Sequence, residues 1–180
     1  WAQISARAPF DIKQHIWHHE EEELVGDKVR GVENHWVLGM KEGAVVGMKP
    51  GDFKKPPGDC TMICTHAWSH IAEHAPWLEA FAASCMLEIA NSDAIIKGGG
   101  VAARVGRKMA RELKIPIKQQ ASNKEHMEVD IIHANMLFEA GQKHITDKAQ
   151  YDLTKSGARK GLAIYKAWLG MMANDMERLR

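Results

Sequence analysis

The sequence predicts an all-α protein, and three observations support this prediction. Apolar residues recur at intervals of three and four along most of the chain, which is the period of an amphipathic helix. Glycine and proline gather in a few short stretches between these segments, where they interrupt helices. No stretch reads convincingly as a strand. We expect one helical domain over residues 1–180, built from about seven helices.

The first helix is expected over residues 9–24. Proline is accepted in a first helical turn, and Asp11 favours a helix start. Ile12, Ile16 and Leu24 recur with helical spacing, Trp17 widens this apolar stripe, and glycine at position 26 ends the helix.

The remaining helices follow from the same signals. A second helix is expected over residues 33–42, after a short link, and a loop rich in glycine and proline follows at 43–58. Further helices are expected at 61–75, from Pro76 through Glu88, after Gly100 up to Pro116, and at 123–140, 145–153 and 156–179.

Composition limits the classes of function. The chain is 45% hydrophobic and 26% charged with a net charge of +1, so no bulk field argues for a nucleic-acid or membrane partner. No apolar run reaches membrane-spanning length, and no signal peptide is visible. Three cysteines without a CxxC pair favour reduced thiols and a cytoplasmic protein. The chain begins at Trp1, and we expect that further N-terminal helices precede it.

The most informative motif is His126-x3-Asp130-x2-His133. Offsets of four and seven residues return to nearly the same side of a helix, so the three side chains point one way. Two imidazoles and a carboxylate suit iron or a similar first-row metal. The alternative is a solvated polar face. Burial is favoured by the apolar residues around the same helix, namely Val129, Ile132, Met136 and Leu137.

Two carboxylate positions add to this motif. Glu88 follows Cys85-Met86-Leu87, and a charged residue in such surroundings is rarely buried unless it is paired, which favours a metal ligand over a surface residue. Four successive glutamates at 20–23 cover all sides of a helical turn, so at least one faces inward. Glu22 is preferred because it follows His18 by one turn and leaves Leu24 to pack; Glu21 and Glu23 are the alternatives.

Two other groups of residues admit a functional interpretation. His66, His70 and His74 form a rival metal stripe with Glu73, for which a polar surface is the favoured interpretation. Basic residues line the helix before Pro116, as a solvated face or as an entrance that attracts an anionic substrate. They are Arg104, Arg107, Lys108, Arg111 and Lys114.

The ordered set Glu22, His35, Glu88, His126, Asp130 and His133 resembles the ligands of the heme-oxygenase-like diiron oxidases and oxygenases of the TenA/PqqC superfamily. The resemblance covers nearly the whole chain. Residues 27–33 look inserted relative to the family. Ferritin-like diiron bundles use Glu-x-x-His pairs, and this sequence has none.

The resemblance implies a heme-oxygenase-like helical bundle and a cofactor of two iron ions held by these six residues, the second ion labile in some members. It implies that O2 is reduced to a bridged peroxide, which attacks a small amino acid, fatty acid or aromatic amine. Manganese remains an alternative to iron. Tyr165 and Trp168 are expected in the core or at the edge of a substrate pocket. We expect a small-molecule substrate and leave open a homodimer.

Two other functions remain open at this point. One is a metal-free, thiaminase-like hydrolase of the same superfamily with Cys85 or Cys60 as nucleophile. The other is a non-enzymatic helical interaction module whose histidines and glutamates face solvent.

Overall fold

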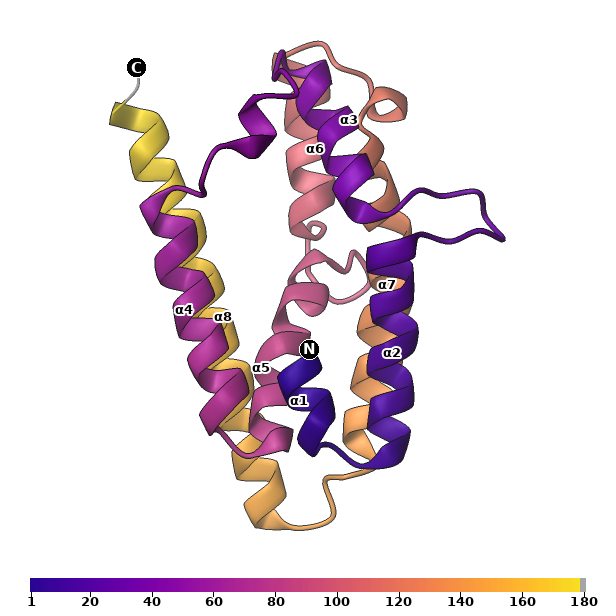
Figure 1. The fold of residues 1–180 in the computed structure, drawn as a ribbon, viewed down its shortest axis with the longest axis vertical. Helices are drawn as coiled ribbons and strands as arrows, with labels where there is room; N and C mark the ends of the chain where they lie inside the picture. The colour runs from indigo at the N-terminus through magenta and orange to yellow at the C-terminus, as the bar shows by residue number, and fades with distance from the viewer. Residues whose placement is uncertain (179–180) are drawn as a thin grey trace. The chain divides into compact units, whose positions relative to one another are not determined.

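The computed structural model describes residues 1–178, and within that range it contains helices and no strand. The α-helices are α1 (Ala2–Arg7), α2 (Phe10–Val25), α3 (His35–Val45), α4 (Asp59–His74), α5 (Trp77–Asn91), α6 (Val101–Glu112), α7 (Ala121–Gln142) and α8 (Lys148–Arg178) (Figure 1). Two short 3-10 helices are η1 (Asp52–Lys54) and η2 (Ile117–Gln119). The prediction of an all-α protein is confirmed. Among the described helices, none has both the length and the apolar character needed to cross a bilayer.

The described residues form two compact units. Unit 1 consists of residues 1–13, 56–87 and 137–178, and unit 2 consists of residues 14–55 and 88–136. In unit 1, α4 and α8 run side by side (Figure 1). Ile4, Phe81 and Leu137 are almost completely buried there. In unit 2, Ile16, Leu38 and Val129 are buried from three different helices, so this unit has its own apolar core.

The two helices expected over residues 145–153 and 156–179 are one continuous helix, α8, and that prediction is wrong; residue 179 lies outside the described residues. Gly157 sits inside this helix. A Cβ atom there would lie 2.0 Å from the carbonyl oxygen of Glu79, and one at Gly161 would lie 2.1 Å from that of Ala83. These two glycines therefore allow α5 to pack closely against α8, and they do not interrupt the helix.

Gly26 ends α2 as the sequence predicts, with φ of +89°. The next helix begins later than expected because Asn34 is its N-cap, accepting a 3.0 Å hydrogen bond from the amide of Val37. The link between α2 and α3 reaches back to α7 through Arg30, whose Nη1 lies 2.8 Å from Oε1 of Glu125. This ion pair holds the α2–α3 link against α7 within unit 2.

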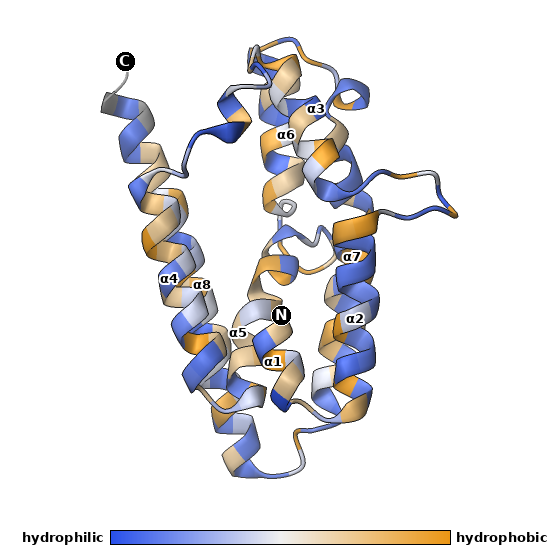
Figure 2. Cartoon of the chain, in the orientation of Figure 1, coloured by the Kyte–Doolittle hydropathy of each residue, from blue (hydrophilic) through white to orange (hydrophobic). Residues whose placement is uncertain are grey.

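The outward face of α2 differs from the prediction. Trp17 and Leu24 are 72% and 70% exposed, so neither belongs to the apolar stripe. The buried positions are Ile12, Ile16 and His19, and Glu23 continues the same line one turn later. Figure 2 shows hydrophilic residues along most of α2. Ile132 on α7 is also exposed, so that helix is less apolar around its circumference than expected.

Candidate metal centre

Unit 2 brings together histidines and carboxylates from α2, α3, α5 and α7. We refer to them as the His–carboxylate cluster: His19, Glu22, Glu23, His35, Glu88, His126, Asp130 and His133. His19, Asp130 and His133 are at most 2% exposed, so the centre of the cluster is shielded from solvent. Buried ionisable groups of this kind require partners or a metal.

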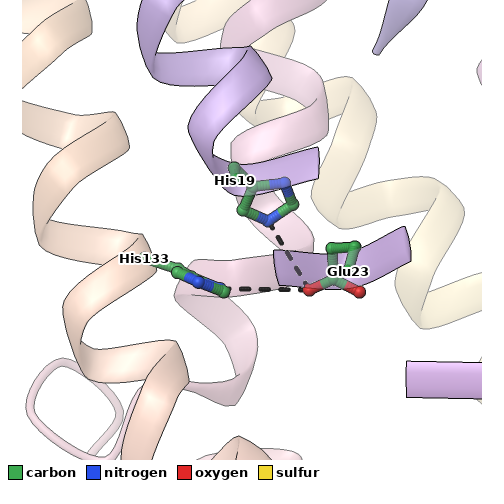
Figure 3. A group of neighbouring side chains, drawn as sticks. All are labelled: His19, Glu23 and His133. Carbon is green, nitrogen blue, oxygen red and sulfur yellow. Dashed lines mark ion pairs between the residues drawn. The ribbon is translucent and has the colours of Figure 1, made fainter. Parts of the chain in front are cut away.

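Two groups within the cluster have the spacing of a metal site. Ligand atoms of His19, Glu23 and His133 lie within 4.8 Å of one another, and so do those of Glu88, Asp130 and His133. His133 belongs to both groups. In Figure 3, dashed lines join the carboxylate of Glu23 to the rings of His19 and His133. Its Oε1 atom is 3.9 Å from Nε2 of His19 and 4.0 Å from Nδ1 of His133.

Glu23 also connects these groups to a second pair of histidines. Its Oε2 atom lies 2.5 Å from Nδ1 of His35. The rings of His35 and His126 then lie 4.6 Å apart, centroid to centroid. One carboxylate therefore lies within 4.0 Å of histidine nitrogens in both halves of the cluster.

Three of the histidines have an oxygen acceptor within hydrogen-bond reach of one ring nitrogen. Nε2 of His133 is 2.7 Å from Oε2 of Glu22, and Nδ1 of His19 is 3.3 Å from Oε1 of Glu20. Nδ1 of His126 lies 2.8 Å from the carbonyl oxygen of Ser122, to which it can only donate. Such outer partners fix the tautomer and orientation of histidines that bind metals.

Asp130 is the most informative member of the cluster. It is completely buried, and neither of its carboxylate oxygens has a hydrogen-bond partner among residues 1–178. Burial, followed by the nearby charges of Glu88 and Glu23, raises the pKa of Asp130 to about 9. Buried polar groups are almost always satisfied, so an orphaned buried carboxylate beside two others indicates a place for a cation. The residues present fit a metal.

The other groups compensate part of the negative charge. Burial raises the pKa of Glu88, but its contacts with His133 and His19 outweigh burial and lower the value to about 2. Burial lowers the pKa of His19, but contacts with Glu20 and Glu88 raise it to about 10. The pKa of His133 is raised against burial by Glu88 and Glu22. The contacts between these imidazoles and carboxylates therefore favour the protonated form of the histidines and the ionised form of Glu88.

The structure brings the six ligands expected from the sequence into this one cluster. Glu88, Asp130 and His133 share one group of ligand atoms. Glu22 contacts His133, and the rings of His35 and His126 lie next to each other at an angle of 55°. The glutamate in the group with His19 and His133 is Glu23, which the sequence left as an alternative. The argument that preferred Glu22 because Leu24 packs inward is wrong, since Leu24 is exposed.

His19 is the member that sequence reasoning missed. Its signal was the spacing Ile12, Ile16, His19 and Glu23, with offsets of four, seven and eleven, which is one face of a helix. Trp17 obscured this face, because a large aromatic residue is usually assigned to the interior. In the structure the histidine occupies the buried position and the tryptophan the exposed one.

The candidate pocket residues and the candidate nucleophilic cysteines lie in unit 1. Tyr165 is 5% exposed, its ring lies 5.9 Å from that of Trp168, and the indole of Trp168 donates a 3.2 Å hydrogen bond to Thr61. Tyr165 is a core residue and Trp168 is partly exposed, and the role of both in a substrate pocket stays a prediction. Cys85 is buried in α5, whereas Cys60 is partly exposed at the start of α4.

The basic residues of α6 are exposed, as the solvated-face interpretation predicts. The guanidinium groups of Arg104 and Arg107 donate hydrogen bonds to the carbonyl oxygens of Lys97 (3.0 Å) and Gly98 (2.9 Å). These two arginines thus hold the glycine-rich turn before α6. An entrance for an anionic substrate stays a prediction.

No protein-family model matches the chain, and no curated protein sequence matches it. The assignment of function therefore rests on the motif and on the geometry of the His–carboxylate cluster.

Proposed function

We propose that this protein is an O2-activating oxidase or oxygenase of the heme-oxygenase-like diiron class, acting on a small metabolite that bears a carboxylate or an amine. The observation that carries the proposal is the carboxylate of Asp130, which is buried without a hydrogen-bond partner among residues 1–178 and lies beside Glu88 and His133. Carboxylates and imidazoles together are the ligand types of non-heme iron.

The cluster divides naturally between two ions. Glu88, Asp130 and His133 would hold one ion, and Glu23 would connect it to a second ion held with His35 and His126. His19 borders the first group through Glu23 and Glu88. When bound, two ferrous ions supply the electrons and the oxidising capacity that dioxygen chemistry requires.

The chain's own residues perform three tasks in this proposal. Glu22 and the carbonyl of Ser122 orient the rings of His133 and His126. Asp130 and the imidazoles release protons when they become ligands, so binding of metal is coupled to release of protons. The burial of His19, Asp130 and His133 keeps bulk water from the centre of the cluster, which strengthens every electrostatic interaction there.

The test is anaerobic loading with Fe(II), followed by desalting, metal analysis and measurement of O2 uptake with candidate amino acids and fatty acids. The wild-type protein is expected to retain iron and consume O2. Asp130→Ala and His133→Ala should lose both properties, whereas Glu21→Gln, an exposed carboxylate on the same helix as Glu23, should lose neither. Iron retention and O2 uptake that persist in Asp130→Ala would contradict the proposal. Loading with Mn(II) in parallel distinguishes the two metals.

A further inference from the structure

A second group of histidines lies on α4, in unit 1, separate in sequence from the His–carboxylate cluster. His66, His70 and His74 are all exposed. The opposite face of α4 packs on α8, where Sγ of Cys64 lies 3.8 Å from the carbonyl oxygen of Ile164. His66 follows Cys64 by two residues, or roughly 200° around the helix. The histidines therefore point away from α8.

Two of these histidines are close enough to act together. The rings of His70 and His74 lie 4.7 Å apart, centroid to centroid. Side chains four residues apart are neighbours on a helix surface, so the backbone of α4 holds this pair in place. Two ligands fixed on one turn of helix bind an ion with less loss of conformational freedom than two independent side chains would.

Glu73 adds a negative charge beside the pair. One of its oxygens accepts a 2.7 Å hydrogen bond from Gln3, and the other is 3.6 Å from Nε2 of His74. The end of α4 already attracts one cation, because the guanidinium of Arg7 donates to the carbonyl oxygens of Ala72 and of Ala75 (2.8 Å). Because these carbonyl oxygens already accept hydrogen bonds from Arg7, the ligands available to a metal ion here are the two imidazoles and not the end of the helix.

We propose that His70 and His74 form a surface site for a divalent transition-metal ion. The affinity of the site is higher for Cu2+ than for Ni2+ or Zn2+. Neutral imidazole suits these three ions, and Cu2+ lies highest in the affinity series of the divalent first-row metals. Water completes the coordination, and the nearby carboxylate of Glu73 adds negative charge beside His74. The site goes beyond the proposed oxygenase function and does not depend on it.

An immobilised Ni2+ chelate tests the site directly, because metal held on a resin reaches exposed imidazoles and not a buried cluster. The untagged wild-type protein is expected to be retained and to elute with imidazole. His70→Ala, His74→Ala and the double variant should elute at lower imidazole concentration. His66→Ala is the matched control, being an exposed histidine on the same helix, and should behave as the wild type does.

Titration with Cu2+ alone gives a second measurement. In the Asp130→Ala background, in which the His–carboxylate cluster is expected not to hold metal, the double variant should lose the electron paramagnetic resonance signal of copper bound by two nitrogen ligands, and each single variant should bind this ion at least about tenfold more weakly at the surface site. Asp130→Ala should keep the surface signal, which separates failure of this site from failure of the oxygenase proposal. Wild-type retention by the double variant, or an equal loss in His66→Ala, would overturn the assignment to His70 and His74.

Discussion

Nε2 of His133 lies 2.7 Å from Oε2 of Glu22, which leaves Nδ1 of the same ring facing Glu88 at 3.5 Å. The two nitrogens of one imidazole thus face two different carboxylates. Since a histidine that binds metal through one nitrogen usually donates the other N–H to an acceptor, the proposed metal centre would use Nδ1 of His133, with Glu22 as the outer partner of the ring.

Glu22→Ala is therefore expected to weaken metal binding without abolishing it. Loss of an outer partner typically costs about 10–100-fold in metal affinity. The affinity for Zn2+, measured by competition with a chelator, should fall in that range while the number of bound ions is kept. Glu22→Gln should recover part of the affinity, because its amide oxygen still accepts the hydrogen bond. Complete loss of metal in Glu22→Gln would instead make Glu22 a ligand.

Glu23 is expected to matter for the number of ions bound rather than for affinity alone. Its two oxygens face His35 on one side and His19 and His133 on the other, so the neutral amide of Glu23→Gln removes the shared ligand. Metal analysis after Fe(II) loading should show at least one ion fewer than in the wild type. The matched control is Glu21→Gln, which should retain the wild-type content. Equal metal content in both variants would count against a bridging role.

Asp130→Asn separates the requirements of metal binding from those of folding. The substitution keeps the shape of the side chain and removes a carboxyl group that is buried without a partner among the described residues. Since such a group is costly to bury, the metal-free variant should be at least as stable as the metal-free wild type. The rise in melting temperature that Zn2+ produces in the wild type should be absent. A strongly destabilised metal-free variant would show that Asp130 has a structural role instead.

Gly157 and Gly161 should tolerate no side chain. A Cβ atom at either position would lie close to the carbonyl oxygens of Glu79 and Ala83, so α5 and α8 would have to move apart. Overpacking of this kind costs about 1–3 kcal/mol, and Gly157→Ala should lower the melting temperature accordingly. Gly170 lies in the same helix with open space around it. Gly170→Ala should raise stability by about 0.4–1 kcal/mol, and a loss there would contradict this explanation.

Glu79 should make the stability of the protein sensitive to acid. Burial raises its pKa, but Lys160 and Ser156, each 2.6 Å from its Oε1, outweigh burial and lower the value below the ordinary 4.5. A lowered folded pKa contributes stability above pH 4.5 that is lost as the pH falls through the folded value. The free energy of unfolding, measured by urea denaturation at a series of pH values, should therefore fall less steeply below pH 4.5 in Glu79→Gln than in the wild type.

The exposed pair of Lys148 and Asp152 provides the control for Glu79. Surface ion pairs contribute about 0–1 kcal/mol, so Asp152→Asn should leave the pH dependence almost unchanged. An acid dependence of Glu79→Gln identical to that of the wild type would contradict the assignment.

The sequence alone determined the helical class and six residues of the cluster. Helical periodicity is a local property, and a motif such as His126-x3-Asp130-x2-His133 fixes which side chains share a face before any tertiary contact forms. Glu88 was identified because a charge among apolar neighbours needs a partner wherever its helix packs.

Only the tertiary structure decided which side of α2 is buried, and hence that His19 and Glu23 join the cluster while Trp17 and Leu24 are exposed. It also decided that Gly157 continues a helix that local rules would break. The physical reason is the same in both cases: the energy of a side chain depends on what the neighbouring helix presents to it. A run of four glutamates has no preferred face until the imidazoles of α3 and α7 are placed beside it.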